Sequence, residues 1–75
     1  MKLAASNNPR RERDVTLTAY QIYRFMKSYM TDAEIRGYKQ ISRPYKSDSN
    51  DRIYADFTDN NGDKHCFMVG ELNNN

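Results

Sequence analysis

The stretch that decides the fold is Arg52–Leu72, with the sequence RIYADFTDNNGDKHCFMVGEL. In it, the segments Arg52–Thr58 and Asp63–Leu72 flank the tetrapeptide DNNG at 59–62. Asn-Gly is the strongest short signal for a β-hairpin, because both residues tolerate positive φ. The stretch therefore predicts two antiparallel strands joined by a tight turn.

The length of this turn decides which side chains face the core. A two-residue Asn61-Gly62 turn pairs Thr58 with His65, and a four-residue loop keeps the same faces, whereas a three-residue loop mixes them. With either of the first two loops, the core face has Ile53, Ala55, Phe57, Cys66, Met68 and Gly70. The outer face then has three large apolar groups that need cover, and these form a predicted secondary surface: Tyr54, Phe67 and Val69.

An amphipathic helix precedes the hairpin. Thr18 and Gln21 match a Thr-x-x-Gln capping box, and Leu17 with Ile22 matches the accompanying hydrophobic staple. At about 100° per residue, six side chains of the helix share a packed face: Ala19, Ile22, Phe25, Met26, Tyr29 and Met30. The opposite face is basic and aromatic: Tyr20, Tyr23, Arg24 and Lys27. We predict a helix over Ala19–Met30.

The segment between helix and hairpin is less regular. Residues 31–34, TDAE, repeat the capping-box pattern and predict a short helical turn that ends at Gly37; alternatively, a strand begins at Glu34. A hairpin alone is marginally stable, so we expect residues 38–43 to supply a third strand. The sequence KSDSND at 46–51 predicts a polar loop.

These elements indicate an α+β fold in which one N-terminal amphipathic helix packs on a three-stranded antiparallel β-meander. Residues 1–14 have no hydrophobic period and end in a mixed charge run, so we expect a flexible basic N-terminal arm. Residues 15–72 then form a single α+β domain, and residues 73–75 a disordered tail. A chain of 75 residues has room for only one small core.

Composition argues against several classes of protein. No apolar run approaches the 18–20 residues of a membrane span, and the N-terminal apolar residues end too early for a signal peptide, so we expect a cytoplasmic protein. One cysteine and one histidine cannot fill a structural zinc site. With Gly62 as the sixth position of an EF-hand loop, Phe57 and Met68 would occupy ligand positions, which breaks that pattern.

Catalytic chemistry is not indicated either. His65 and Cys66 are neighbours in a predicted strand, so their side chains leave opposite faces and cannot form a nucleophile–base pair. The three glycines are isolated, and no phosphate-binding loop is present. We expect no enzymatic activity, no catalytic residue, no metal and no cofactor.

The positive charge of the chain is concentrated in the part that contains the predicted helix. Residues 1–52 have 11 Lys/Arg and 6 Asp/Glu, whereas residues 53–75 have 1 and 4. Basic and aromatic residues together suit a protein interface, in which Tyr and Arg are enriched, and they also suit phosphates with unpaired bases. The predicted partner-binding residues are Tyr20, Tyr23, Arg24, Lys27, Arg43, Tyr45 and Lys46. Further cations extend this surface: Arg10, Arg11, Arg13, Arg36 and Lys39.

The leading functional expectation is a small non-enzymatic binding protein that occupies a surface of a larger protein or complex. The alternative is a nucleic-acid-binding regulatory protein that uses the helix face and the arm; a subunit without separate activity is a third. Homodimerisation through the outer sheet face or a sheet edge is a further candidate, and no membrane partner is expected. Size, split charge and exposed tyrosines have the general character of phage or mobile-element accessory proteins and inhibitors of host defence machinery. No motif carries that likeness.

Overall fold

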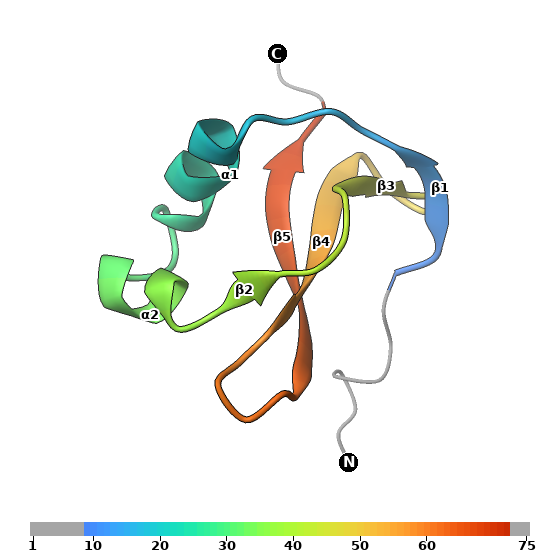
Figure 1. Ribbon diagram of the computed structural model, residues 1–75. Helices are drawn as coiled ribbons and strands as arrows, with labels where there is room; N and C mark the ends of the chain where they lie inside the picture. The colour runs from blue at the N-terminus through green and yellow to red at the C-terminus, as the bar shows by residue number, and fades with distance from the viewer. Residues whose placement is uncertain (1–8, 73–75) are drawn as a thin grey trace.

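The computed structural model describes residues 9–72 (Figure 1). They form a small α+β fold with two helices and a five-stranded antiparallel sheet. In chain order the elements are β1 (Arg11–Asp14), α1 (Ala19–Met26), α2 (Asp32–Arg36), β2 (Lys39–Gln40), β3 (Tyr45–Ser47), β4 (Arg52–Thr58) and β5 (Lys64–Glu71). The expected α+β class is confirmed, but the structure has two helices and five strands where one helix and three strands were predicted.

Both predicted capping boxes are present. Thr18 Oγ1 accepts from the N–H of Gln21 and Thr31 Oγ1 from that of Glu34, while each of these side chains accepts from the N–H of its threonine. The helical interpretation of residues 31–36 is therefore correct.

Helix α1 ends at Met26 rather than at the predicted Met30. The hydroxyl and the backbone N–H of Ser28 both donate to the carbonyl of Phe25, at 2.6 Å and 3.0 Å. Serine side chains compete in this way with the regular helical ladder, and the chain turns here.

The hairpin has a three-residue loop, Asn60–Gly62, and the expected pairing is wrong by one residue. The N–H of Asp59 donates to the carbonyl of Asp63, the N–H of Gly62 donates back to Asp59, and Gly62 has φ +86°. This loop needs positive φ at one residue only, whereas a two-residue turn of the Asn-Gly type needs it at two. Phe57 therefore pairs with His65.

The changed register exchanges the faces of β5. Ala55 pairs with Phe67, and an irregularity beside Tyr54 brings Ile53 opposite Gly70 and leaves Val69 as an extra residue. The core now receives Val69 and Phe67 instead of Met68 and Cys66. The exchange replaces two sulfur-containing side chains in the core with a β-branched and an aromatic one.

The edge beside β4 is split between two short strands. Both β2 and β3 pair with β4, β2 near its C-terminal end and β3 near its N-terminal end. Between them the N–H of Asp56 donates to the hydroxyl of Ser42 instead of to a strand carbonyl. The third strand expected at residues 38–43 is therefore only β2, and β3 takes part of the expected polar loop.

Part of the predicted flexible N-terminal arm is a strand. Residues 11–14, expected to be flexible, form β1, which pairs with β3 through Arg11–Ser47 and Asp14–Tyr45. The rest of that expectation, for residues 1–8, and the expected tail at 73–75 lie outside the described residues. Figure 1 shows β1 on the side of the sheet away from the two helices.

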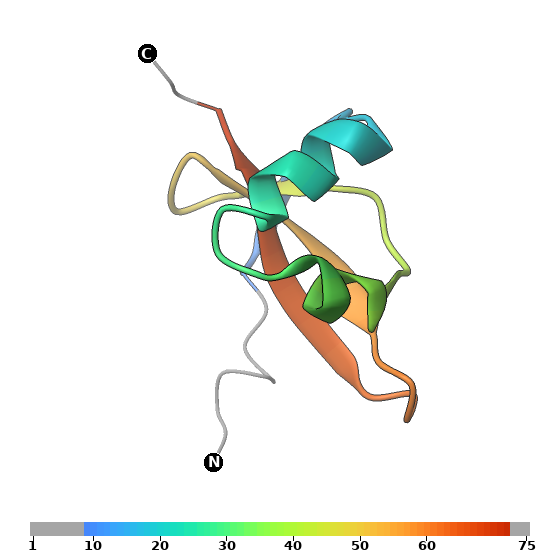
Figure 2. The ribbon, with the colours of Figure 1, turned by 90° about the vertical axis from the view of Figure 1, so that its left-hand side faces the viewer.

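The core lies between α1 and the sheet. Figure 2 shows the two helices on the viewer's side of the sheet. Its buried side chains are Ile22, Met26, Ile53, Ala55, Phe57 and Val69. Leu17, the residue before the N-cap, packs so closely on Gly70 that a Cβ there would lie 3.3 Å from Leu17 Cδ1. The staple thus fixes the entry of α1 against β5.

Candidate functional site

The outer face of α1 has two cation–aromatic pairs, each spanning one helical turn. The guanidinium carbon of Arg24 lies 5.8 Å from the ring centroid of Tyr20, and Lys27 Nζ lies 5.6 Å from that of Tyr23. Residues four apart are neighbours on a helix, which explains the repeated geometry. The structure thus brings together the four residues predicted for this face.

Tyr20 and Tyr23 have different environments. Tyr20 is 67% exposed, whereas Tyr23 is half-buried and its hydroxyl donates to Asp32 Oδ1 at 2.7 Å. This bond lowers the pKa of Asp32, and the neighbouring Arg36 acts in the same direction. Tyr23 therefore ties α1 to α2, and Tyr20 is the freer of the two tyrosines.

A shallow hollow of about 410 Å³ lies beside Arg24. Its other lining residues are Gln21, Phe25 and Ser28. Phe25, expected in the core, is half-exposed and stands edge-on to Tyr29 with ring centroids 6.4 Å apart. The early end of α1 explains this, because Tyr29 no longer follows the helical spiral and donates its hydroxyl to the carbonyl of Met68 on β5.

The cations of the N-terminal segment do not extend the α1 face. Arg11 and Arg13 lie on β1, on the side of the sheet away from the helices (Figure 1), and Arg10 directly precedes this strand. All three have carboxylate partners. Arg36, which lies on α2, also has a carboxylate partner, Asp32, at 2.9 Å. A continuous basic surface from the arm to the helix is therefore not formed.

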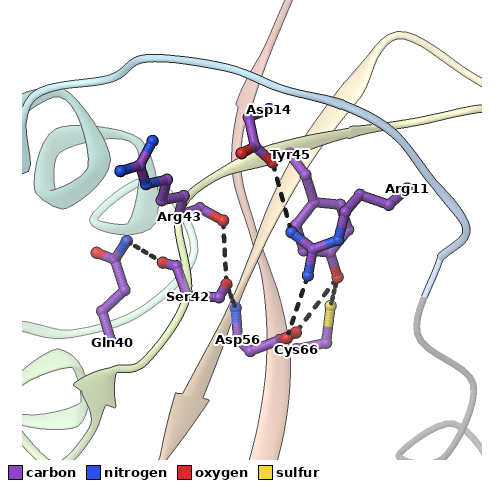
Figure 3. Close-up of polar contacts among 8 residues, drawn as sticks. All are labelled: Arg11, Asp14, Gln40, Ser42, Arg43, Tyr45, Asp56 and Cys66. Atoms are coloured by element: carbon purple, nitrogen blue, oxygen red, sulfur yellow. Dashed lines mark hydrogen bonds and ion pairs between the residues drawn. The ribbon is translucent and has the colours of Figure 1, made fainter.

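Three predicted binding residues lie elsewhere. Tyr45 is only 1% exposed and lies under Arg11, whose guanidinium carbon is 4.0 Å from the ring centroid. The side chain of Lys46 is 12% exposed and pairs with Glu12 at 3.0 Å, which lowers the pKa of that carboxyl. Arg43 is exposed, and Figure 3 shows its side chain directed away from the cluster around Tyr45. Tyr45 and Lys46 stabilise the fold rather than offer a surface.

The polar cluster in Figure 3 fixes β1 to the sheet. The hydroxyl of Tyr45 lies 3.3 Å from Asp56 Oδ1 and 3.3 Å from Cys66 Sγ, and Arg11 approaches Asp56 Oδ2 at 3.9 Å. Burial raises the pKa of Tyr45 and that of the Cys66 thiol. A thiol kept protonated in this way is a poor nucleophile.

The predicted secondary surface does not form one face. Val69 is 1% exposed in the core, Phe67 packs against that core, and Tyr54 lies on the opposite side of the sheet beside Tyr45. The three-residue loop is the cause, because it moves Phe67 and Val69 to the inner face. Homodimerisation through a sheet face or a sheet edge remains a prediction.

His65 packs within the hairpin. Its Nε2 lies 2.9 Å from Asp59 Oδ2, and its ring contacts Tyr38 and stacks on Phe67. Asp59 Oδ1 accepts from the N–H groups of Asn61 and Asp63. The contact with His65, followed by the two backbone bonds, lowers the pKa of Asp59, and the three contacts together close the loop.

Sequence reasoning missed the hollow beside Arg24. The 3.6-residue period places Phe25 in the middle of the packed face, so no local pattern marks it as half-exposed. Ser28 gives a signal in retrospect, since serine near a helix end favours local bonds that stop the helix.

Within residues 9–72, no helix is long and apolar enough to cross a bilayer. Comparison of the chain with protein-family models, with curated proteins and with solved structures finds no match.

Proposed function

We propose that this chain is a small non-enzymatic binding protein that occupies a surface of a larger protein through the outer face of α1. The observation that carries the proposal is the Tyr20–Arg24 pair. Tyr20 is the most exposed large apolar side chain among the described residues, and Arg24 lies beside its ring. Tyr and Arg are the residue types that most often anchor protein interfaces.

The packing of α1 supports the same assignment. Ile22 and Met26 commit the inner side of the helix to the core, so the outer side is held rigidly. A preorganised surface loses less conformational entropy on binding than a flexible one. Within this proposal the protein acts as an accessory or inhibitory protein, because occupying a partner's surface excludes other ligands from it.

The nucleic-acid alternative has less support. Proteins that bind single strands need rows of free cations along the backbone and open aromatic rings for bases. Here the arginines at positions 10, 11 and 13 are paired with carboxylates, and the rings of Tyr20 and Tyr23 each have a cation beside them. What remains on α1 suits a compact protein contact better than a phosphate track.

An affinity pull-down from lysate, with and without nuclease treatment, tests the proposal. The test variant is Tyr20→Ala/Arg24→Ala, and the matched control is Lys64→Ala, an exposed cation at the start of β5. Both should melt close to the unaltered protein, because surface changes usually cost within about 0.5 kcal/mol. The double variant should lose about 2 kcal/mol of binding, roughly thirtyfold in Kd, while the control keeps its affinity.

Two results would contradict the proposal. Capture that disappears after nuclease treatment would identify nucleic acid as the partner. Equal capture by the double variant and the control, with both folded, would remove the α1 face from consideration. Tyr23 is left unchanged in the test, because its bond to Asp32 makes any substitution there a stability variant too.

A further inference from the structure

We infer that the outer face of α1 recognises an acidic protein segment, with a partner carboxylate bound by the guanidinium of Arg24. The inference rests on the proposed function, because it names the chemistry of the partner that this face takes. It is carried by the unpaired charge of Arg24 and by the side chains around it.

The charge on and around α1 is positive. No Asp or Glu occurs from Val15 to Thr31, so α1 and its flanking turns have only positive charge. Within residues 9–72, Arg24 has no carboxylate within 4.0 Å, whereas Arg11 has two, and Arg36 and Lys46 have one each. Arg24 is therefore a cation that the fold leaves without a counter-charge.

The guanidinium of Arg24 has a shape that suits a carboxylate partner. A guanidinium presents a planar fork of N–H donors that matches the two oxygens of a carboxylate, and the pairing is strongest when both bonds form. The neighbouring Tyr20 ring, 5.8 Å away, restricts the side chain on one side. Restriction before binding reduces the entropy that is lost when the carboxylate docks.

A second cation and a hollow with an apolar side chain lie near Arg24. Lys27 lies three residues further along, and side chains at this spacing have Cβ atoms about 5–6 Å apart. Carboxylates spaced three or four residues apart on a partner helix have the same separation. The hollow lined by Gln21, Phe25 and Ser28 offers an apolar contact next to the charge. Lys27 lies close enough to Asp32 to help lower the pKa of that carboxyl, so the main charged contact of an acidic amphipathic segment falls on Arg24, with an apolar side chain of the segment against Phe25.

The probe for this inference is a synthetic helical peptide with Glu residues four apart and Leu between them, and its counterpart with Gln at every Glu position. Binding to the full chain is measured by fluorescence anisotropy at two salt concentrations. The Glu peptide should bind at least tenfold more tightly than the Gln peptide, with a difference that shrinks at high salt. Oligo(dT) serves as a phosphate probe in the same assay.

A series of variants at one position separates charge from packing. Arg24→Lys should weaken binding of the Glu peptide a few-fold, Arg24→Gln about tenfold, and Arg24→Glu more than Arg24→Gln. Lys64→Gln, which removes an equal charge far from α1, should leave the affinity unchanged. An equal loss for Arg24→Gln and Lys64→Gln would reduce the effect to net charge and overturn the inference.

Other outcomes separate this inference from the proposed function. No binding of the Glu peptide, or equal binding of the Gln peptide, overturns the acidic partner. If the pull-down then still depends on Tyr20 and Arg24, the protein-binding function stands and only the partner's chemistry is wrong. Tighter binding of oligo(dT) that depends on Arg24 would assign the face to phosphate and overturn both.

Discussion

The hydroxyl of Tyr45 lies 3.3 Å from the Sγ of Cys66, which pairs with Asp56 on the neighbouring strand. Tyr45 is buried, so this contact lies inside the protein even though sequence reasoning assigned Tyr45 to a binding surface. The cluster connects β3, β4 and β5 beneath β1, and its properties can be measured without any knowledge of a partner.

The Cys66 thiol should react slowly in the folded protein. Burial raises its pKa above the ordinary value, so the thiolate fraction at pH 8 is smaller than in the unfolded chain. Alkylation by iodoacetamide, followed against pH, should have a higher midpoint in native buffer than in urea. Coincident midpoints would show that the thiol is as acidic in the folded protein as in the unfolded chain, and would contradict the raised pKa.

Arg11 should stabilise the fold more than its neighbour Arg13. Arg11 lies over the Tyr45 ring and reaches Asp14 and Asp56, whereas Arg13 pairs with the adjacent Glu12. We expect Arg11→Ala to lower the free energy of unfolding by about 1 kcal/mol, and Arg13→Ala by less than about 0.5 kcal/mol. Urea denaturation at low and high salt measures both. Equal effects of the two variants would mean that β1 is not held through Tyr45.

The core should respond unequally to truncation. Ile22→Ala and Phe57→Ala remove buried side chains, and each should cost about 2–5 kcal/mol. Phe25 is half-exposed and lies outside the buried cluster, so Phe25→Ala should cost less, about 1–2 kcal/mol. Thermal or urea unfolding of the three variants checks this order. A larger loss for Phe25→Ala than for Ile22→Ala would require a different rotation of α1.

The Asp59–His65 contact should make the hairpin sensitive to acid. The bond from His65 lowers the pKa of Asp59 from its ordinary value of 3.8. A carboxyl whose folded pKa is lowered stabilises the protein above the unfolded pKa, and this contribution is lost as the pH falls through the folded pKa. His65→Gln should move the Asp59 pKa back towards 3.8 in a carboxyl-detected NMR titration. An unchanged titration would assign the shift to the loop N–H groups alone.

The sequence predicted the local structures correctly where one short motif decides them. The two capping boxes, the α2 turn and the position of the hairpin all follow from residues within four positions of one another. The register of β4 with β5 did not follow. It depends on whether Asn60–Gly62 or Asn61-Gly62 forms the loop, and the DNNG sequence at 59–62 is compatible with both.

The candidate site was predicted in part for the same reason. Helical periodicity places Tyr20, Tyr23, Arg24 and Lys27 on one face, and they lie together in the structure. The burial of Tyr45 and Lys46 depends on β1, whose residues RERD have no apolar member and so give no strand pattern. Their partners on β3 are more than thirty positions away, beyond the reach of any local rule.

The pairing of β1 with β3 also bears on the order of events during synthesis. Residues 11–14 are made early, but their partner strand at residues 45–47 and its own neighbour β4 are made much later. The buried cluster likewise needs Val69, near the end of the chain, before Ile22 and Met26 can be covered. Closing such long loops precedes the gain from the contacts they bring together. A nascent chain therefore has little to gain from folding before β5 is complete.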